Sequence, residues 1–236
     1  MTKLLQIMAG AKVGGAEKFF ERLAIAFENA GIKQRVAIRQ NNDRTALLRE
    51  AGIQPFEYRF GGILDLTTQR KIQNLTDDFE PDIILAWMSR GAQYLPKKVS
   101  QNCIRVARLG GYYNLKYFKK CDYLIGNTED ICTYLKNEGW PAEKVVYLPN
   151  FVDDTLAPPI DRSQFNTPES VPLLLGLGRL HENKAFDTGI KALVDIPNAY
   201  YWIAGEGPRR QELMDLAEKL GVSERVKFLG WRNDVA

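Results

Sequence analysis

Two turns near the C-terminal end of the sequence carry the residues best suited to hold a phosphate. The first, Gly178-Arg179-Leu180-His181-Glu182-Asn183-Lys184, places an arginine where an apolar stretch ends and a lysine where a helical pattern begins. An arginine guanidinium can grip two oxygens as a fork, whereas a lysine ammonium acts as a point charge. The pair suits a diphosphate, and it could also stabilise negative charge that grows on a departing group.

The second turn is Gly205-Glu206-Gly207-Pro208. Its glycines permit a close approach of the backbone to a ligand, and Pro208 suits the first position of a helix. Glu206 either receives hydroxyl groups or is simply an acid favoured by the dipole at a helix start. The motif is weak alone and gains weight because it follows the first turn closely.

A third glycine-bearing turn, Gly10 to Gly15, follows the first apolar stretch and precedes a helical pattern. Adjacent glycines at a helix N-terminus expose N–H groups to an anion, although the same pattern also describes a tight turn that packs a helix on a sheet. It is not a GxGxxG dinucleotide fingerprint, which also needs an acidic residue after the second strand. That strand ends in Arg39-Gln40-Asn41-Asn42, so NAD is disfavoured.

Metal chemistry and histidine catalysis have little support in this sequence. His181 is the single histidine, and we interpret it as a solvated loop residue in preference to a catalytic acid. No group of histidine, cysteine and acidic residues has the spacing of metal ligands. The sequence therefore predicts neither a metal nor a cofactor.

These turns need strands and helices to position them, and the hydrophobic pattern supplies both in alternation. In the first part, buried strands are expected at 4–9, 35–39, 56–60, 82–87, 103–109, 123–127 and 145–148. Helices are expected at 16–27, 44–50, 65–79, 114–120 and 129–138. Such alternation predicts an α/β fold with a parallel, doubly wound sheet that is covered on both faces.

The alternation stops in a proline-rich stretch and then restarts. Residues 149–172 hold five of the eleven prolines, so we predict a first domain at 1–155, a linker at 156–172 and a second domain at 173–236. The second domain shows strands at 173–178, 200–204 and 226–229, with helices at 186–194 and 209–220. Three strands make a small sheet, so we expect this domain to be incomplete.

Composition and charge narrow the classes of partner. Residues 1–150 contain 22 Lys and Arg against 16 Asp and Glu, whereas residues 151–236 contain 10 against 13. A basic first half is consistent with contact at an anionic membrane surface, or simply with an uneven solvated surface. Three cysteines without CxxC spacing indicate reduced, buried thiols and a cytoplasmic location. No apolar run reaches membrane-spanning length, and no nucleic-acid-binding motif is found.

Four dispersed motifs, in order and at matching spacing, resemble the retaining family 4 glycosyltransferases of the GT-B fold. They are Gly14-Gly15-Ala16-Glu17, then Gly178-Arg179-Leu180 with Lys184-Ala185-Phe186-Asp187, then Gly205-Glu206-Gly207-Pro208, and finally Arg225-Val226-Lys227-Phe228-Leu229-Gly230. The resemblance covers nearly the whole chain and implies two facing Rossmann-like domains. The first domain would hold the acceptor, and the second would hold a nucleotide sugar.

The resemblance also assigns roles to individual residues. Arg179 and Lys184 would be catalytic, because they would grip the donor diphosphate as it leaves. The donor site would further include Gly14, Gly15, Gly178, Gly205, Glu206, Gly207, Gly230 and Trp231. The segment after Gly230 would contact the nucleobase through its backbone.

The sequence departs from the family pattern in two places. Two glutamates that relatives place beyond the last strand are expected after the end of this sequence, and without them activity would be weak. A histidine of the first domain is also absent from Arg105-Val106-Ala107-Arg108-Leu109-Gly110-Gly111-Tyr112. Backbone amides at Gly110 and Gly111, or the Arg108 side chain, could replace it. Arg108, Gly110 and Tyr112 are therefore the candidate acceptor residues.

The resemblance thus implies an enzyme that transfers a sugar from a nucleotide sugar to a glycan or lipid-linked acceptor with retention of configuration. Bacterial cell-envelope glycan biosynthesis, such as that of lipopolysaccharide, is the expected setting. The expected location is the cytoplasm, with peripheral contact at the inner face of the membrane. Two alternatives stay open: a sugar-nucleotide epimerase of the same fold, and a non-catalytic fragment that binds nucleotide sugars.

Overall fold

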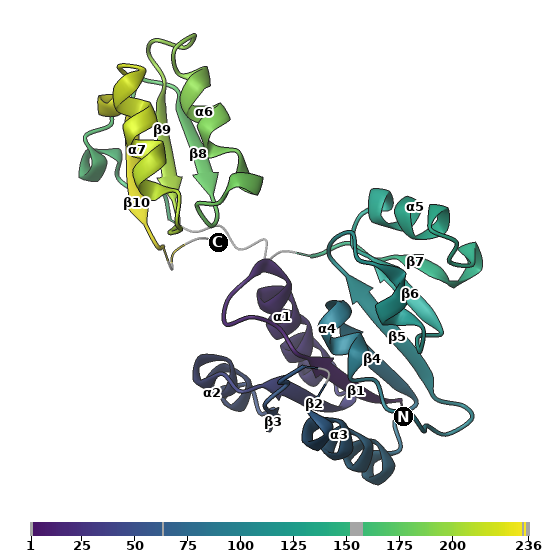
Figure 1. The fold of residues 1–236 in the computed structure, drawn as a ribbon. Helices are drawn as coiled ribbons and strands as arrows, with labels where there is room; N and C mark the ends of the chain where they lie inside the picture. Colours follow the sequence, from purple (N-terminus) through teal and green to yellow (C-terminus); the bar gives the residue numbers. More distant parts are fainter. Residues whose placement is uncertain (1, 63, 152–157, 233, 235–236) are drawn as a thin grey trace. The chain divides into compact units, whose positions relative to one another are not determined.

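The computed structural model describes residues 2–62, 64–151, 158–232 and 234 (Figure 1). The chain forms two compact units, Met1–Phe151 and Val152–Ala236. Each unit is an α/β layer structure built on its own parallel sheet.

The first unit is built on a sheet of seven parallel strands in the order β3-β2-β1-β4-β5-β6-β7. The order reverses direction between β1 and β4, as in doubly wound folds. The strands are β1 (Lys3–Met8), β2 (Lys33–Arg39), β3 (Phe56–Tyr58), β4 (Ile83–Trp87), β5 (Ile104–Leu109), β6 (Tyr123–Gly126) and β7 (Val145–Tyr147).

Helices cover both faces of this sheet (Figure 1). Successive residues of a strand point to opposite faces, so Leu4 and Met8 of β1 pack on one side with α1 and α2, and Leu5 and Ile7 pack on the other with α3, α4 and α5. The helices are α1 (Gly15–Asn29), α2 (Asn42–Glu50), α3 (Leu66–Phe79), α4 (Met88–Gln93) and α5 (Glu129–Asn137), with short 3-10 helices η1 (Leu115–Phe118) and η2 (Ala142–Lys144).

Local sequence signals explain where several helices begin and end. The side chains of Asn41, Asp65 and Thr128 each accept a hydrogen bond from the first turn of α2, α3 and α5, as helix N-caps do. The chain leaves α1 through Gly31, whose φ of 71° is easily reached only by glycine. The three cysteines are buried and unpaired, as predicted, and burial raises the pKa of Cys121 to about 12.

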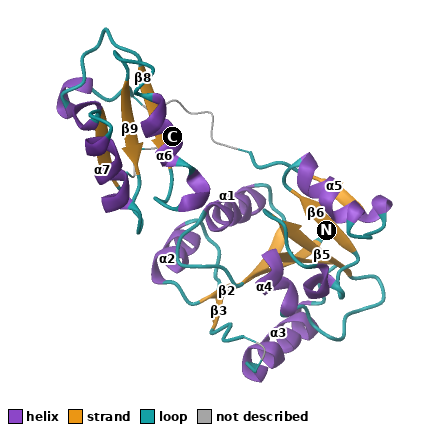
Figure 2. Cartoon of the chain, turned by 45° about the horizontal axis from the view of Figure 1, so that its top comes forward, coloured by secondary structure: helices purple, strands orange, loops and turns teal. Residues whose placement is uncertain are grey.

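The second unit has three parallel strands in the order β10-β9-β8 (Figure 1), of which β8 and β9 are also labelled in Figure 2. They are β8 (Leu173–Leu177), β9 (Tyr200–Ala204) and β10 (Val226–Gly230). Helices α6 (Phe186–Ala192) and α7 (Arg210–Lys219) share one apolar core with the sheet, which includes Ile190, Tyr201, Ile203 and Leu213. The 3-10 helices are η3 (Arg162–Phe165), η4 (Glu182–Lys184) and η5 (Ser223–Arg225).

Part of the stretch with linker composition packs onto this second sheet. The indole N–H of Trp202 donates a hydrogen bond of 2.9 Å to the hydroxyl of Thr167. The ring of Phe165 meets the same indole edge to face, at 4.9 Å between ring centres. Residues 158–172 of the predicted linker therefore lie within the second unit. The other two predicted linker residues, 156 and 157, lie outside the described residues.

The expected strands and α-helices are all present with shifts of a few residues at their ends, the short 3-10 helices η2 to η5 were not predicted, and three further differences concern the helices. The sequence pattern does not predict α4, which begins at Met88. The helix expected at 114–120 is the four-residue 3-10 helix η1. Pro208 does not open a helix, because α7 begins two residues later, at Arg210.

Candidate functional site

The carboxyl ends of the three strands of the second unit meet at three glycines. The N–H of Gly178 donates to the carbonyl of Ala204 at 3.0 Å, and the N–H of Gly205 donates to the carbonyl of Gly230 at 2.7 Å. In an open α/β sheet, ligands bind beyond this edge. The predicted site residues of the second unit are therefore gathered at the edge where a ligand is expected.

The two glycine-bearing turns that follow β8 and β9 pack directly on each other. A methyl group on Gly205 would lie 1.9 Å from the carbonyl oxygen of Gly178, and one on Gly207 would lie 2.3 Å from that of Leu180. The N–H of Leu180 also donates to the carbonyl of Glu206 at 3.0 Å. Glycine is thus required at 205 and 207 by the neighbouring turn, a reason that the sequence pattern does not reveal.

The Lys184 side chain lies along the first turn. Its Cδ and Cε atoms would be 3.8 Å from a methyl group on Gly178, so its methylenes cover the end of β8. Ala185 follows with a φ of 50°, which turns the chain from η4 into α6. Arg179 and His181 are exposed on the same turn. The structure thus brings Lys184 to the strand ends, and the side chains of Arg179 and Lys184 are both exposed.

Acidic residues of this region have structural partners. Glu206 pairs with Arg210 at 3.6 Å, and its carboxylate would be 3.2 Å from a methyl group on Gly230. Asp187 pairs with Lys191 at 2.8 Å and lies 3.9 Å from Arg209. The hydrogen bond from Lys191 lowers the pKa of Asp187. Trp231 follows Gly230 and is 59% exposed.

In the first unit, the turn between β1 and α1 is closed by Glu17. Its carboxylate accepts a hydrogen bond of 2.7 Å from the N–H of Ala11, and the residue is 6% exposed. Methyl groups on Gly10 and Gly14 would lie 2.4 and 2.3 Å from its oxygens. A methyl group on Gly15 would meet no atom within 4 Å. Gly15 therefore presents open backbone at the N-terminus of α1.

The candidate acceptor residues differ strongly in exposure. Arg108 is only 3% exposed, its guanidinium lies 4.3 Å above the Phe19 ring, and it donates to the carbonyl of Leu148 and the side chain of Asn150. Burial lowers the pKa of this guanidinium to about 10. Arg108 therefore cannot contact an acceptor freely in this arrangement.

Tyr112, by contrast, is 63% exposed. Its hydroxyl donates to the carboxylate of Asp130, and this hydrogen bond raises the pKa of Tyr112. Gly110 lies near Asn127, which follows β6. A methyl group on Gly110 would be 3.7 Å from the side-chain nitrogen of Asn127. Gly110 and Tyr112 thus lie on the loop that follows β5, as the sequence implies.

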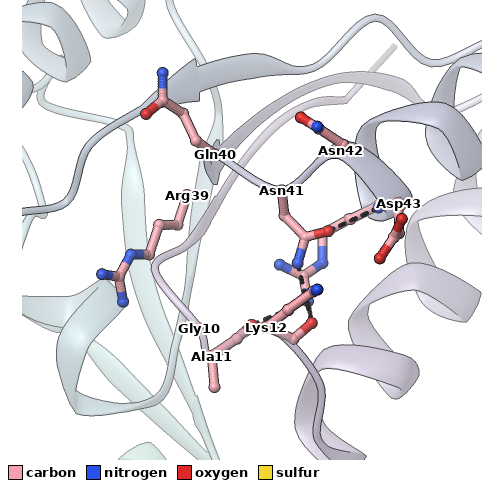
Figure 3. Close-up of a pocket in the computed structure, with 9 residues that line it drawn as sticks. Gly10, Ala11, Lys12, Arg39, Gln40, Asn41, Asn42 and Asp43 are labelled. Carbon is pink, nitrogen blue, oxygen red and sulfur yellow. Dashed lines mark hydrogen bonds between the residues drawn. The ribbon is translucent and has the colours of Figure 1, made fainter.

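Sequence reasoning missed a pocket of about 530 Å³ at the carboxyl ends of β1 and β2 (Figure 3). It is lined by Gly10, Ala11, Lys12, Arg39, Gln40, Asn41, Asn42, Asp43 and Arg44. The stretch after β2 served only to exclude NAD, although cations beside a helix N-cap were visible in it. Among the described residues, no group of three histidine, cysteine or acidic side chains could hold a metal.

Comparison with known proteins identifies the family. A sequence model described as Glycosyltransferase Family 4 matches residues 13–156, more than half of the chain. The chain belongs to glycosyltransferase family 4. A second model, described as Glycosyl transferases group 1, matches residues 159–236. In this family 4 chain, each matched range corresponds closely to one structural unit.

Two curated relatives from Rhizobium meliloti are described as lipopolysaccharide core biosynthesis glycosyltransferases. LpsD is 31% identical over 98% of this chain and 67% of its own length. LpsE is 32% identical over 94% of this chain and 65% of its own length. The family 4 chain thus spans about two thirds of each relative.

Solved structures share the fold. Anabaena HepE in complex with UDP and glucose superposes with a TM-score of 0.78 at 20% identity, over 99% of this chain and 70% of that one. UDP-GlcNAc 2-epimerase from Neisseria meningitidis gives a TM-score of 0.57 at 14% identity, over 98% and 73%. The predicted fold class, α/β of the GT-B type, is confirmed. No described helix is long and apolar enough to cross a membrane.

Proposed function

We propose that this chain carries the acceptor and donor sites of a glycosyltransferase that moves a sugar from a nucleotide sugar to a glycan or lipid-linked acceptor. The relatives' names point to cell-envelope glycan assembly, of which lipopolysaccharide core biosynthesis is one form. The Anabaena HepE structures are complexes with UDP and with UDP-glucose, which supports a nucleotide-sugar donor. The net positive charge of residues 1–150 favours work in the cytoplasm at the anionic inner face of a membrane.

One observation supports the donor site above all others: Lys184 lies over Gly178, at the edge where β8, β9 and β10 end together. A diphosphate at this edge would meet the Lys184 ammonium and the Arg179 guanidinium, neither of which forms an ion pair with a described residue. Gly205, Glu206 and Gly207 form the wall of the site. The backbone at Gly230 and Trp231 would receive the nucleobase, and Gly14 and Gly15 are the donor-binding residues that we propose in the first unit.

The mechanism that we propose retains the configuration of the transferred sugar. The bond between the anomeric carbon and the diphosphate oxygen breaks as the acceptor oxygen forms a bond to the same carbon from the same face, and the acceptor's hydroxyl proton passes to the leaving diphosphate. Arg179 and Lys184 would stabilise the charge that grows on the diphosphate. They lower the barrier only to the extent that they bind the transition state more tightly than the ground state. No metal or cofactor takes part in this proposal. Gly110 and Tyr112 would contact the acceptor, and Arg108 would position the 148–150 segment.

The two alternatives predict different products. An epimerase converts a nucleotide sugar when no acceptor is present, and a non-catalytic fragment binds the nucleotide sugar without changing it. Both relatives above 30% identity are described as glycosyltransferases, and the epimerase superposes with a lower TM-score than HepE. These observations favour transfer.

The test combines binding with product analysis on the same protein. Calorimetric titration with UDP-, GDP- and ADP-sugars should reveal one preferred donor. Transfer from that donor to a glycan acceptor should be detected by mass spectrometry, with the anomeric configuration of the product read by NMR. Binding of no nucleotide sugar, or isomerisation of the donor without an acceptor, would overturn the proposal.

A further inference from the structure

The pocket between the ends of β1 and β2 is not used by the mechanism above. We infer that it binds an anionic oxygen group, a phosphate ester or a carboxylate, that is carried by the sugar acceptor. The inference rests on the proposed function, in which the first unit receives the acceptor. A volume of about 530 Å³ accommodates a sugar with such a group, since small-molecule pockets are typically about 300–1,000 Å³.

Three side chains form hydrogen bonds with the backbone of Ala11 and Lys12 beside this pocket. Glu17 accepts from the N–H of Ala11 at 2.7 Å. From α2, Arg44 donates to the carbonyls of Ala11 and Lys12, each at 3.3 Å, and Asn41 donates to the carbonyl of Lys12 at 3.0 Å. A loop that is fixed before binding loses little conformational freedom when a ligand arrives. The pocket is therefore built in advance of its ligand.

Arg44 is one of the residues that line the pocket, and it belongs to a buried ion pair. It is 2% exposed, and its Nε lies 3.0 Å from the Glu21 carboxylate. Lys18 approaches the other oxygen of Glu21 at 3.1 Å. The Nη1 of Arg44 is buried and has no hydrogen-bond partner among the described residues. A buried donor without a partner is unfavourable, and the residue that carries it is one of those that line the pocket.

Two further cations line the pocket without forming an ion pair with any described residue: Lys12 and Arg39, both exposed. In the view of Figure 3, the Arg39 side chain extends away from Asn41 and Asp43, whereas both cations belong to residues that line the pocket. The first N–H groups of α2, at Asn42 and Asp43, make no hydrogen bond within the described residues. A helix N-terminus and cations together favour an anion.

Asp43 is the one carboxylate in the lining, and it opposes an anionic ligand. Its presence gives the test a substitution of opposite sign. Gly14 and Gly15, the residues proposed to approach the donor phosphate, do not line the pocket. The lining thus favours a ligand other than the donor diphosphate, and the acceptor is the other substrate of the proposed reaction.

The experiment measures binding of glucose 6-phosphate, glucuronate and the neutral methyl glucoside from the amide shifts of Lys12, Asn42 and Asp43 in NMR spectra. We expect one or both anionic sugars to bind more tightly than methyl glucoside, and the better one identifies phosphate or carboxylate as the group. The Lys12→Gln/Arg39→Gln variant should weaken that binding by about tenfold or more, because charge-assisted hydrogen bonds are lost. Asp43→Asn should strengthen it about threefold by removing a repulsive charge.

The matched control is Lys119→Gln/Lys136→Gln, which removes two positive charges from exposed positions outside the pocket. It should change the affinity for the anionic sugar by less than about twofold, since exposed distant charges are screened by salt. Equal losses in the control and the pocket variant would overturn the inference, as would anionic sugars that bind no better than methyl glucoside.

Calorimetric titration of the same variants with the preferred nucleotide sugar separates this inference from the proposed function. Unchanged donor affinity in the pocket variant supports an acceptor subsite. Parallel loss of donor and anionic-sugar affinity would assign the pocket to the donor and overturn the inference. If wild type binds no nucleotide sugar but still binds the anionic sugar through Lys12 and Arg39, the proposed function fails while the anion site stands.

Discussion

The Glu17 carboxylate accepts a hydrogen bond of 2.7 Å from the backbone N–H of Ala11, and it thereby closes the turn between β1 and α1. The same carboxylate occupies the space where a side chain at position 14 would begin, with an oxygen 2.3 Å from that point. Gly14 has a φ of 177°, an extended conformation open to any residue. A side chain at position 14 would therefore force the Glu17 carboxylate to move from its place on the turn.

This relationship predicts a strong coupling between Gly14→Ala and Glu17→Ala. Gly14→Ala should cost about 1–3 kcal/mol of stability through overpacking, and Glu17→Ala about 1–2 kcal/mol through the lost hydrogen bond. In the Glu17→Ala background, Gly14→Ala should cost less than about 0.5 kcal/mol, because its clash is gone. Urea denaturation of the four proteins, followed by circular dichroism, measures the cycle. Additive costs would contradict it.

A second prediction concerns Arg108, a buried cation whose guanidinium faces aromatic rings and forms no ion pair with a described carboxylate. Desolvation of a charge opposes folding, and replacing such a charge by an apolar side chain of similar size is often neutral or stabilising. Arg108→Met should therefore lower the free energy of unfolding by no more than about 1 kcal/mol, and it could raise it by up to about 3 kcal/mol. Arg108→Ala should destabilise by about 2–4 kcal/mol, because it leaves a cavity.

The pH dependence of Arg108 follows from its lowered pKa of about 10. Between this value and the higher pKa of an arginine in the unfolded chain, the unfolded chain binds more protons than the folded chain, so stability gains a contribution as pH rises. Below pH 9 both states are protonated and the contribution is constant. The difference in stability between wild type and Arg108→Met should therefore be flat from pH 6 to 9 and shift toward wild type above about pH 10. A difference that varies between pH 6 and 9 would contradict this assignment.

Much of the fold could be predicted because its signals are local. The apolar face of α1 and the buried runs of β1 and β4 repeat at periods that belong to a helix and to strands. Helix α4 was not predicted because six residues are too few to show a helical period. It packs closely against β1, since a methyl group on Gly91 would lie 2.7 Å from the carbonyl oxygen of Ile7. No pattern within residues 88–93 reports that contact.

The candidate sites show the same limit. Arg179 and Lys184 lie on the turn between β8 and α6, so their place near the sheet edge could be predicted from the strand and helix pattern. The burial of Arg108 depends on Phe19 and on the 148–150 segment, which are distant in sequence. The glycines at 205 and 207 serve the turn after β8, so their role became visible only once β8 and β9 were known to be neighbours.

Ala185 offers a fourth prediction. Its φ of 50° is in the left-handed region, which costs a non-glycine residue about 1–2 kcal/mol. Glycine removes this strain but adds about 0.4–1 kcal/mol of unfolded-state entropy. Ala185→Gly should therefore stabilise the chain by up to about 1 kcal/mol. Ala192→Gly, in the last turn of α6, is the matched control and should destabilise by about 0.5–1 kcal/mol. Thermal unfolding followed by circular dichroism distinguishes the two, and a destabilised Ala185→Gly would contradict the strain.

The last prediction separates shape from charge at the proposed diphosphate site. Arg179→Lys keeps the charge but loses the planar fork, so affinity for the preferred nucleotide sugar should fall about tenfold. Lys184→Met keeps the methylenes that cover Gly178 and removes only the ammonium, so affinity should again fall about tenfold while stability changes little.

Lys219→Met, at the far end of α7, removes the same charge from an exposed position and should leave affinity within about twofold. Calorimetric titration at two salt concentrations completes the test. Both site variants should show a weaker salt dependence than wild type, because each removes or loosens a contact between a cation and a phosphate. If Lys184→Met and Lys219→Met bind the nucleotide sugar equally well, the ammonium that lies at the end of β8 does not touch the diphosphate, and the site must be sought elsewhere on the sheet edge.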